Sequence, residues 1–390
     1  DRGMEGNDHK VSLLPDEFAQ MVQGIRRIEE SMGQGGERSI SQGEMMNREV
    51  LAKSLVADCD IPAGVEIVES MVRIQSPGQG LQPNRLNDLI GRRLPVSKKR
   101  GEIFFPSDLE KPAAIPRMYK FKQPFGLPVR YHDIKTFSKA SNLDLVEIHL
   151  SYKDLEVNLD EVLPDREGIG LVIHAPELFA GDHTLDLCTD DDSYRQHSRN
   201  ELQRVIDISR DLRERFQCNE SVLLVTNVGG FSEHRHLTRE ERLPLQRRLK
   251  ESLSQINTSG EVEIIPQTMP PFPWHFGGQR FHNLFVDAEF IQNFCEELSM
   301  RICLDVSHSK LACNHLHTPF RDFLDKILPF TAHLHLADAK DVDGEGLQIN
   351  EGEIDWIQLF LQIQKHCPKA SFIPEIWQGH KNFGEGAWLA

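Results

Sequence analysis

Seven polar side chains stand at or just after the ends of short apolar runs, where they could do chemistry together. Five are imidazoles or carboxylates and two are amides: His174, Asp305, His308, His335 and Glu375, with Asn227 and Gln267. Carboxylate and imidazole ligands suit a divalent ion such as Mn²⁺, Mg²⁺, Co²⁺ or Zn²⁺. Because Asp305, His335 and Glu375 come from three consecutive runs, the sequence predicts a metal site there. A structural ion-pair network is the alternative, but buried acidic groups seldom stay without a cation.

The apolar runs that must position these side chains are predicted to be strands: Leu127–Arg130, Leu143–Leu150, Gly170–His174, Val222–Thr226, Val262–Pro266, Arg301–Asp305, His333–Leu336 and Ser371–Glu375. Amphipathic helices are predicted between them, best seen at Asn200–Phe216, Glu240–Ile256, Ala288–Leu298, Phe320–Leu328 and Ile354–Ile363. This alternation predicts an α/β fold, a closed (β/α)8 TIM barrel whose active site lies at the carboxyl ends of the strands. An open doubly wound sheet is the alternative, although no Gly-rich phosphate turn follows an early strand.

Charge and cysteine content argue against several classes of protein. The chain has 390 residues and a formal net charge of −16, which would repel a phosphate backbone, so no nucleic-acid partner is expected. No run of about 18 apolar residues occurs, so no membrane span or membrane partner is predicted. The seven cysteines are scattered and form no Cys-x-x-Cys pair, which is typical of a reduced, cytoplasmic protein.

Two smaller modules precede the barrel. We divide the chain into residues 1–47, ending in a Gly/Ser-rich linker, a module at 48–112, a linker at 113–126 and the barrel at 127–390. The first module has one amphipathic helix, from Asp16 to about Met32, whose apolar face needs a partner; we expect that partner to precede residue 1 in a longer protein. The second contains a near-repeat of strand, glycine turn, short strand and helical turn, at Ser54–Met71 and Arg93–Leu109.

Three motifs near the C-terminus carry a family resemblance: Cys-Leu-Asp-Val-Ser-His at 303–308, His-Leu-Ala-Asp-Ala-Lys at 335–340 and Pro-Glu-Ile at 374–376. They resemble the xylose-isomerase-like barrel superfamily, which includes ketose 3-epimerases, inosose dehydratases and endonuclease-IV-type DNA-repair enzymes. The resemblance implies that Asp305, His335 and Glu375 are metal ligands and that His308 reaches hydroxyl groups of a small sugar.

Three further residues are predicted to contact the sugar: His174, Asn227 and Trp274. His174 lies in a His-Ala-Pro motif and by resemblance serves the substrate, with a hydrogen-bonded structural histidine as the alternative. Asn227 follows the fourth strand. Trp274 ends a Pro-rich segment after the fifth strand, which would form a rigid wall of the pocket or serve packing alone.

One position departs from the family pattern. Where the family has a Glu that is both a ligand and an acid/base group, this chain has Gln267. An amide oxygen can still coordinate a metal, but it cannot take a proton at neutral pH. Epimerisation through an enediolate requires a base on each face of that intermediate. One-base isomerisation, dehydration and a non-catalytic barrel all stay open. The DNA-repair members need extra ligands that Thr226-Asn227 and Asp343–Gln348 do not supply, so DNA repair is disfavoured.

The first two modules resemble sialic-acid (nonulosonic acid) synthases of the NeuB family. Residues 1–13 are similar to the tail of their catalytic TIM barrel, and the near-repeat looks like their antifreeze-like SAF domain, a β-clip. The resemblance implies a swapped homodimer in which the SAF module covers the partner's active site, and it makes Asp8 a contact of an amino sugar. The family's metal-binding histidines and enolpyruvate site lie earlier in that barrel, so this chain alone is not expected to perform the condensation. Ser76 replaces a substrate-binding Arg, which suggests a different sugar.

Together these features predict the C-terminal part of a bifunctional sugar-acid biosynthesis protein with a metal-dependent isomerase/epimerase-like barrel. Glu375 would shuttle the proton and His308 would orient the substrate. The alternative is a non-catalytic barrel that scaffolds a nonulosonic acid synthase dimer.

Two histidine-rich features need a choice. His333 and His335 should point the same way from one strand, and His335 is the predicted ligand because its spacing to Asp338 carries the family match. A second cluster, Cys313, His315 and His317, is expected in an exposed loop after the sixth strand, where a dedicated zinc site is disfavoured.

Overall fold

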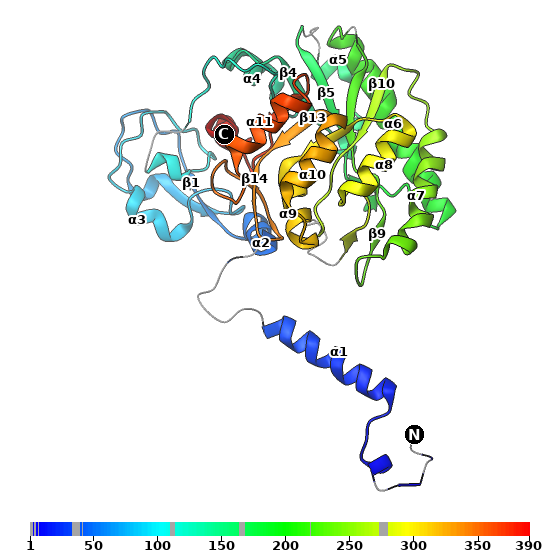
Figure 1. The fold of residues 1–390 in the computed structure, drawn as a ribbon. Helices are drawn as coiled ribbons and strands as arrows, with labels where there is room; N and C mark the ends of the chain where they lie inside the picture. The colour runs from blue at the N-terminus through cyan, green and yellow to red at the C-terminus, as the bar shows by residue number, and fades with distance from the viewer. Residues whose placement is uncertain are drawn as a thin grey trace. The chain divides into compact units, whose positions relative to one another are not determined.

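The computed structural model describes residues 3, 5–6, 8–32, 40, 42–109, 114–163, 168–218, 220–272 and 280–390. The chain separates into two compact units, Asp1–Ile40 and Ser41–Ala390. The first unit contains a 3₁₀ turn, Asp8–Lys10, and helix α1, Pro15–Met32 (Figure 1). Helix α1 confirms the predicted helix, and its apolar side chains are exposed within the described residues: Phe18, Met21, Val22, Ile25, Ile28 and Met32.

The small module begins with helix α2, Gln42–Leu51, which the sequence analysis did not predict and which crosses the expected boundary at residue 47. It continues with β1, Ser54–Ala57, paired to β2, Val72–Gln75, and with the short helix α3, Leu86–Leu89. Three antiparallel bridges join the halves of the near-repeat: Val56 with Ile103, Ile61 with Lys98 and Glu66 with Arg93. Each half ends in a 3₁₀ turn, as predicted: Glu69–Met71 and Pro106–Asp108.

Eight parallel strands form the barrel: β3 Gly126–Val129, β4 Leu145–His149, β5 Gly170–His174, β8 Val222–Thr226, β10 Val262–Pro266, β12 Ile302–Asp305, β13 Thr331–Leu336 and β16 Ser371–Pro374. They pair in the orders β10-β8-β5-β4-β3 and β12-β13-β16. Parallel bridges between Phe125 and Phe372 and between Gln267 and Cys303 close the ring. The closed barrel is therefore confirmed, and the open sheet is wrong.

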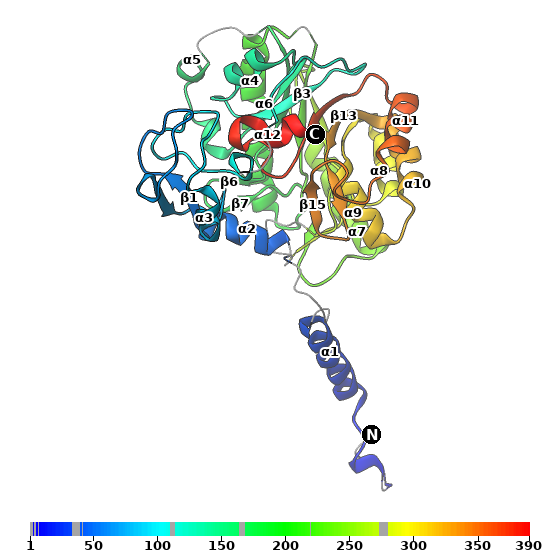
Figure 2. The ribbon, with the colours of Figure 1, turned by 90° about the vertical axis from the view of Figure 1, so that its left-hand side faces the viewer.

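Helices follow the strands and cover the outside of the barrel (Figures 1 and 2): α4 Ile134–Ala140, α5 Leu159–Val162, α6 Asp192–Arg215, α7 Arg239–Ser254, α8 Ala288–Leu298, α9 Val306–Leu316, α10 Phe320–Ile327, α11 Trp356–His366 and α12 Lys381–Leu389. Short strand pairs lie in the loops: β6 Leu178–Phe179 with β7 His183–Thr184, β9 Phe231–Ser232 with β11 Phe281–His282, and β14 Asp338–Lys340 with β15 Gly344–Leu347. Cys313 and His315 lie on α9, so the exposed loop expected there is wrong, and Cys313 is buried.

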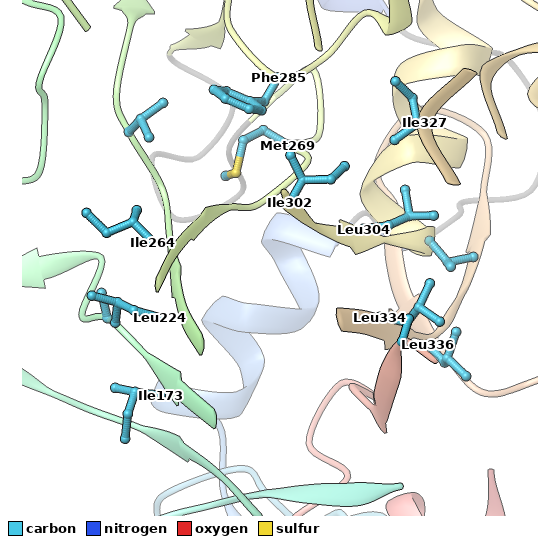
Figure 3. Close-up of a cluster of buried hydrophobic side chains, with 14 of the residues drawn as sticks. Ile173, Leu224, Ile264, Met269, Phe285, Ile302, Leu304, Ile327, Leu334 and Leu336 are labelled. Carbon is cyan, nitrogen blue, oxygen red and sulfur yellow. The ribbon is translucent and has the colours of Figure 1, made fainter. Parts of the chain in front are cut away.

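Along most of the barrel strands, side chains alternate between two buried clusters. Figure 3 shows part of the larger cluster, in which Ile173, Leu224 and Leu334 pack. The smaller cluster consists of their neighbours inside the barrel: Leu145, Val172, Val225, Ile265, Cys303, Ala332 and Ile373. Because residues i and i+2 share a face of a regular strand, the residues two beyond Leu145, Val172, Ile265, Cys303 and Ile373 point to the same interior at its carboxyl end; β13 departs from this period, since its register shifts between Thr331 and His333.

Candidate active site

A cavity of about 710 Å³ opens at the carboxyl ends of the barrel strands. Its wall includes five of the predicted site residues: His174, Gln267, Asp305, His308 and Glu375. Four of them follow an interior residue by two positions, as Asp305 follows Cys303 and Glu375 follows Ile373. The two-residue period of the strands therefore brings together side chains that are far apart in the sequence.

The four predicted metal residues converge on one ring nitrogen. His335 Nδ1 lies 2.6 Å from Glu375 Oε2 and 3.7 Å from Asp305 Oδ2. Gln267 Nε2 lies 3.2 Å from His335 Nδ1 and 3.1 Å from Asp305 Oδ2. The ligand atoms of His174, His335 and Glu375 also lie within 4.8 Å of one another. Two carboxylates and one or two imidazoles are a donor set that fits a divalent cation.

A buried carboxylate that the sequence analysis missed lies beside His335. Glu147 is 0% exposed, and its Oε2 lies 3.1 Å from His335 Nε2 and 2.7 Å from His333 Nε2. Its Oε1 lies 2.9 Å from His149 Nε2. Because a carboxylate accepts, His335 donates from Nε2 and directs Nδ1 at Glu375. The available signal was Glu147 and His149 alternating with the outward-facing Val146 and Ile148 of β4, the second strand of the barrel.

Protonation at this centre is set by these contacts. Burial opposes a charge on His335, yet Cys303, Glu147 and Glu375 raise the pKa of its imidazole well above the usual range. Burial would raise the pKa of Glu375, but His335 and its neighbouring histidines hold that pKa far below the usual range. Burial lowers the pKa of His174. Glu375 is therefore ionised near neutral pH and available to a cation.

His308 and Glu345 form a hydrogen-bonded pair in the cavity wall, and Glu345 was not singled out from the sequence. His308 Nδ1 lies 2.9 Å from the carbonyl oxygen of Thr268, which only accepts, so Nδ1 carries a hydrogen. His308 Nε2 lies 2.9 Å from Glu345 Oε1, a contact that needs a proton on one of the two atoms. Burial opposes a charge on His308, but Asp305 and Glu345 raise the pKa of its imidazole to about 10. Burial also raises the pKa of Glu345. The pair therefore holds one transferable proton at neutral pH.

Three predicted residues lie elsewhere or outside the described part of the chain. Asn227 is buried, its Oδ1 accepts the Gly229 N–H at 2.8 Å, and it is not among the described residues that line the cavity. Trp274 lies outside the described residues, so its expected place in the pocket wall stays a prediction. Asp8 begins the 3₁₀ turn of the first unit, where its carbonyl oxygen accepts the Ser12 hydroxyl at 2.7 Å.

Asp338, whose spacing from His335 supported the family match, has a structural role in the loop after β13. It is fully buried, and its carboxylate accepts hydrogen bonds from four donors: the N–H groups of Ala339, Asn350 and Ile354 and the indole of Trp356. Asp338 thus ties the loop after β13 to the start of α11. The motif therefore contains a loop anchor, Asp338, three positions after the predicted ligand His335.

Comparison with known sequences decides the family. A sequence model of the xylose isomerase-like TIM barrel matches residues 137–390. The chain belongs to this family. Models of the SAF domain and of the NeuB family match residues 52–110 and 1–37.

Curated relatives of this xylose isomerase-like chain include legionaminic acid, pseudaminic acid and N-acetylneuraminate-9-phosphate synthases. The N,N'-diacetyllegionaminic acid synthase of Campylobacter jejuni is 33% identical over 103 residues, which is 26% of this chain and 30% of the relative. The N-acetylneuraminate-9-phosphate synthase of Mus musculus is 30% identical over 112 residues, 28% of this chain and 31% of the relative. The chain therefore spans under a third of the length of these relatives.

Solved structures similar to the chain include sugar-handling barrels. A D-tagatose 3-epimerase-like protein has a TM-score of 0.47 and 18% identity, over 65% of this chain and 92% of its own. The IOLI protein with a bound zinc atom has a TM-score of 0.47 and 14% identity, over 68% of this chain and 94% of its own.

Among the described residues, no helix has the length and apolar character needed to cross a bilayer.

Proposed function

We propose that the barrel at 127–390 is a metal-dependent sugar isomerase or epimerase-type enzyme acting on a small sugar or amino sugar. The observation that carries the proposal is the convergence of Asp305 and Glu375 on His335 Nδ1 at the wall of a cavity of about 710 Å³. A cavity of this size suits a small ligand. The synthase relatives support a sugar of a nonulosonic acid pathway as the substrate class.

Asp305, His335 and Glu375 would hold the divalent cation, with Gln267 beside them. When bound, the ion supplies polarisation of adjacent carbonyl and hydroxyl oxygens, which acidifies the C–H between them. Glu147 keeps His335 oriented through Nε2, so that Nδ1 remains directed at the ligand position.

The chain's own groups provide one base and one acid. The Glu375 carboxylate takes the proton from the carbon next to the carbonyl group, and the C–H electron pair forms the double bond of an enediol. The proton held between His308 and Glu345 passes to the carbonyl oxygen. Glu375 then gives its proton to the former carbonyl carbon, and the hydroxyl group on the neighbouring carbon gives its proton to the His308–Glu345 pair. The carbonyl group has then moved by one carbon, and atoms and charge balance. This division supports isomerisation through Glu375 as the only carbon base, because Gln267 cannot accept a proton.

The test combines metal content with exchange of carbon-bound hydrogen. Protein loaded with Mn²⁺ or Zn²⁺ is incubated with ketoses, aldoses and N-acetylated amino sugars in D₂O, and deuterium at the carbon next to the carbonyl is read by mass spectrometry. We expect a stoichiometric ion and sugar-specific deuterium incorporation, with both lost in Glu375→Gln and kept in the exposed control Glu351→Gln. A protein that binds no divalent ion, or a Glu375→Gln variant as active as the wild type, refutes the proposal.

A second candidate is a non-catalytic barrel that supports a synthase assembly. It is favoured by the Gln267 amide, whose Nε2 lies within hydrogen-bond distance of both Asp305 and His335. An N–H group there would satisfy the Asp305 carboxylate without a cation, while the His335 Nδ1–H donates to Glu375. Absence of metal binding by the wild-type protein would select this candidate. A homodimer formed through the SAF module and a cytoplasmic location stay predictions.

A further inference from the structure

The segment at 376–385, directly after Glu375, forms one wall of the cavity and has a strained backbone. Ile376, Trp377, Gln378 and His380 line the cavity. Gln378, Asn382 and Phe383 have φ values of 58°, 48° and 57°, in the left-handed region that residues other than glycine rarely adopt. Such conformations persist only where the surroundings hold them.

Residues of the small module hold this segment. The carboxylate of Glu49, on α2, accepts hydrogen bonds from the side chains of Gln378 and Lys381. The ion pair is largely shielded, since the Glu49 and Lys381 side chains are 17% and 13% exposed. A second contact comes from Ser107, whose hydroxyl lies 3.0 Å from Glu385 Oε2 and 3.1 Å from Asn382 Nδ2. Two polar contacts from one module therefore bracket the strained residues.

Helix α2 is held against the small module, so the position of Glu49 depends on the position of that module. The Gly78 N–H donates to the carbonyl oxygen of Glu49 at 2.9 Å. A Cβ at Gly78 would lie 2.3 Å from the carbonyl oxygen of Arg48, so only glycine allows the loop this close to the helix. Figure 2 shows α2 beneath the small module and on the side of the barrel where α12 lies.

The far side of the segment is fixed to catalytic groups. The Trp377 N–H donates to the carbonyl oxygen of Gly346 at 2.7 Å, next to Glu345 on β15. The Gly346 N–H in turn donates a hydrogen bond to the hydroxyl oxygen of Ser307, next to His308, at 3.0 Å. A displacement of the segment would therefore move Glu375 at its start and the His308–Glu345 pair at its flank.

We propose that the SAF module acts within its own chain as the support of the barrel's cavity wall, with Glu49 as a positioning residue. The contact of Glu49 with Gln378 and Lys381 holds the left-handed backbone that follows Glu375. The structural part of this inference stands by itself, and its consequence for the metal centre rests on the proposed function.

The first test reverses the ion pair. Glu49→Lys places two cations together and should raise hydrogen–deuterium exchange in residues 376–385 roughly tenfold, while the barrel strands stay protected. The double variant Glu49→Lys/Lys381→Glu restores an opposite pair and the wild-type net charge, and should restore the slow exchange. Glu66→Lys is the matched control, because Glu66 pairs with Arg93 inside the small module, at 2.6 Å. Equal exchange in the wild type and Glu49→Lys overturns the proposal, as does a double variant that stays fast.

The second test follows Mn²⁺ affinity in the same four proteins, with thermal melting as a check of folding. We expect the Kd for Mn²⁺ to rise about threefold or more in Glu49→Lys, to recover in the double variant and to stay unchanged in Glu66→Lys. An unchanged Kd in a folded Glu49→Lys protein refutes the positioning part. A wild-type protein that binds no Mn²⁺ refutes the proposed function instead, and the exchange experiment still decides whether the module supports the wall.

Discussion

Nδ1 of His335 lies 2.6 Å from Oε2 of Glu375, while the other nitrogen of the same ring lies 3.1 Å from Glu147. The ring thus connects a partly exposed carboxylate of the cavity to a carboxylate that is fully buried. Loss of the Glu375 carboxylate should therefore affect ligand binding, because it lines the cavity. Loss of the Glu147 carboxylate should affect stability, because it is buried.

Glu147→Gln should destabilise the barrel strongly. The amide has one acceptor oxygen where the carboxylate faces His333 and His335 with one oxygen and approaches His149 with the other, and it leaves the buried imidazolium of His335 with one counter-charge fewer. Removal of one partner of a buried ion pair typically costs about 3–5 kcal/mol. Urea unfolding with a chelator present measures the loss, and the exposed Glu156→Gln is the control. A loss below about 1 kcal/mol would contradict the role given to Glu147.

Gln267→Glu should make the barrel depend on a cation. A carboxylate there adds a ligand but removes the N–H that faces Asp305 and His335. We expect the Kd for Mn²⁺ to fall about tenfold, roughly 1.4 kcal/mol, and the melting temperature to fall in chelator and recover with Mn²⁺. Isothermal titration and thermal melting measure both, with the exposed Gln255→Glu as control. Unchanged affinity would show that Gln267 does not face the ion.

The His308–Glu345 pair should make stability depend on pH in the alkaline range. The folded-state pKa of His308 is about 10, above the unfolded value of about 6.5. Its bound proton therefore contributes stability that is fully present below about pH 6.5 and is lost as the pH rises through about 10. The stability difference between metal-free wild type and Glu345→Gln should be largest near pH 6 and shrink toward pH 10. Unfolding curves across this range measure it, and a difference that grows with pH would contradict the pairing.

Asp338→Asn should loosen the loop before α11 without removing the metal site. In the wild type, four donors point at the two carboxylate oxygens of Asp338. In the variant, the amide nitrogen replaces one of these oxygens and faces the donors, so the hydrogen bonds to that oxygen are lost. Hydrogen bonds to a charged group are worth about 1.5–3 kcal/mol each, so we expect a loss of about 3 kcal/mol in unfolding free energy. Chemical denaturation measures this loss and Mn²⁺ titration the metal site, with the exposed Asp341→Asn as control. Weaker metal binding at unchanged stability would place Asp338 in the metal site instead.

The sequence alone determined the barrel, the order of its strands and the residues at their carboxyl ends. These features are local, because a strand shows its two-residue period and its end within a few positions, and the motifs at Asp305, His335 and Glu375 lie within such windows. The same period could have indicated Glu147 and His149 on β4, the second strand of the barrel.

Only the tertiary structure decided which side chains meet. Glu147 contacts His333 across 186 positions, and Glu49 reaches Lys381 across 332. Such pairs depend on how the strands stagger when the barrel closes and on how the small module docks, and no local pattern records either. For the same reason Asn227 turned into its own loop, and Glu345 completed a proton-holding pair with His308 that the spacing of the motifs did not indicate.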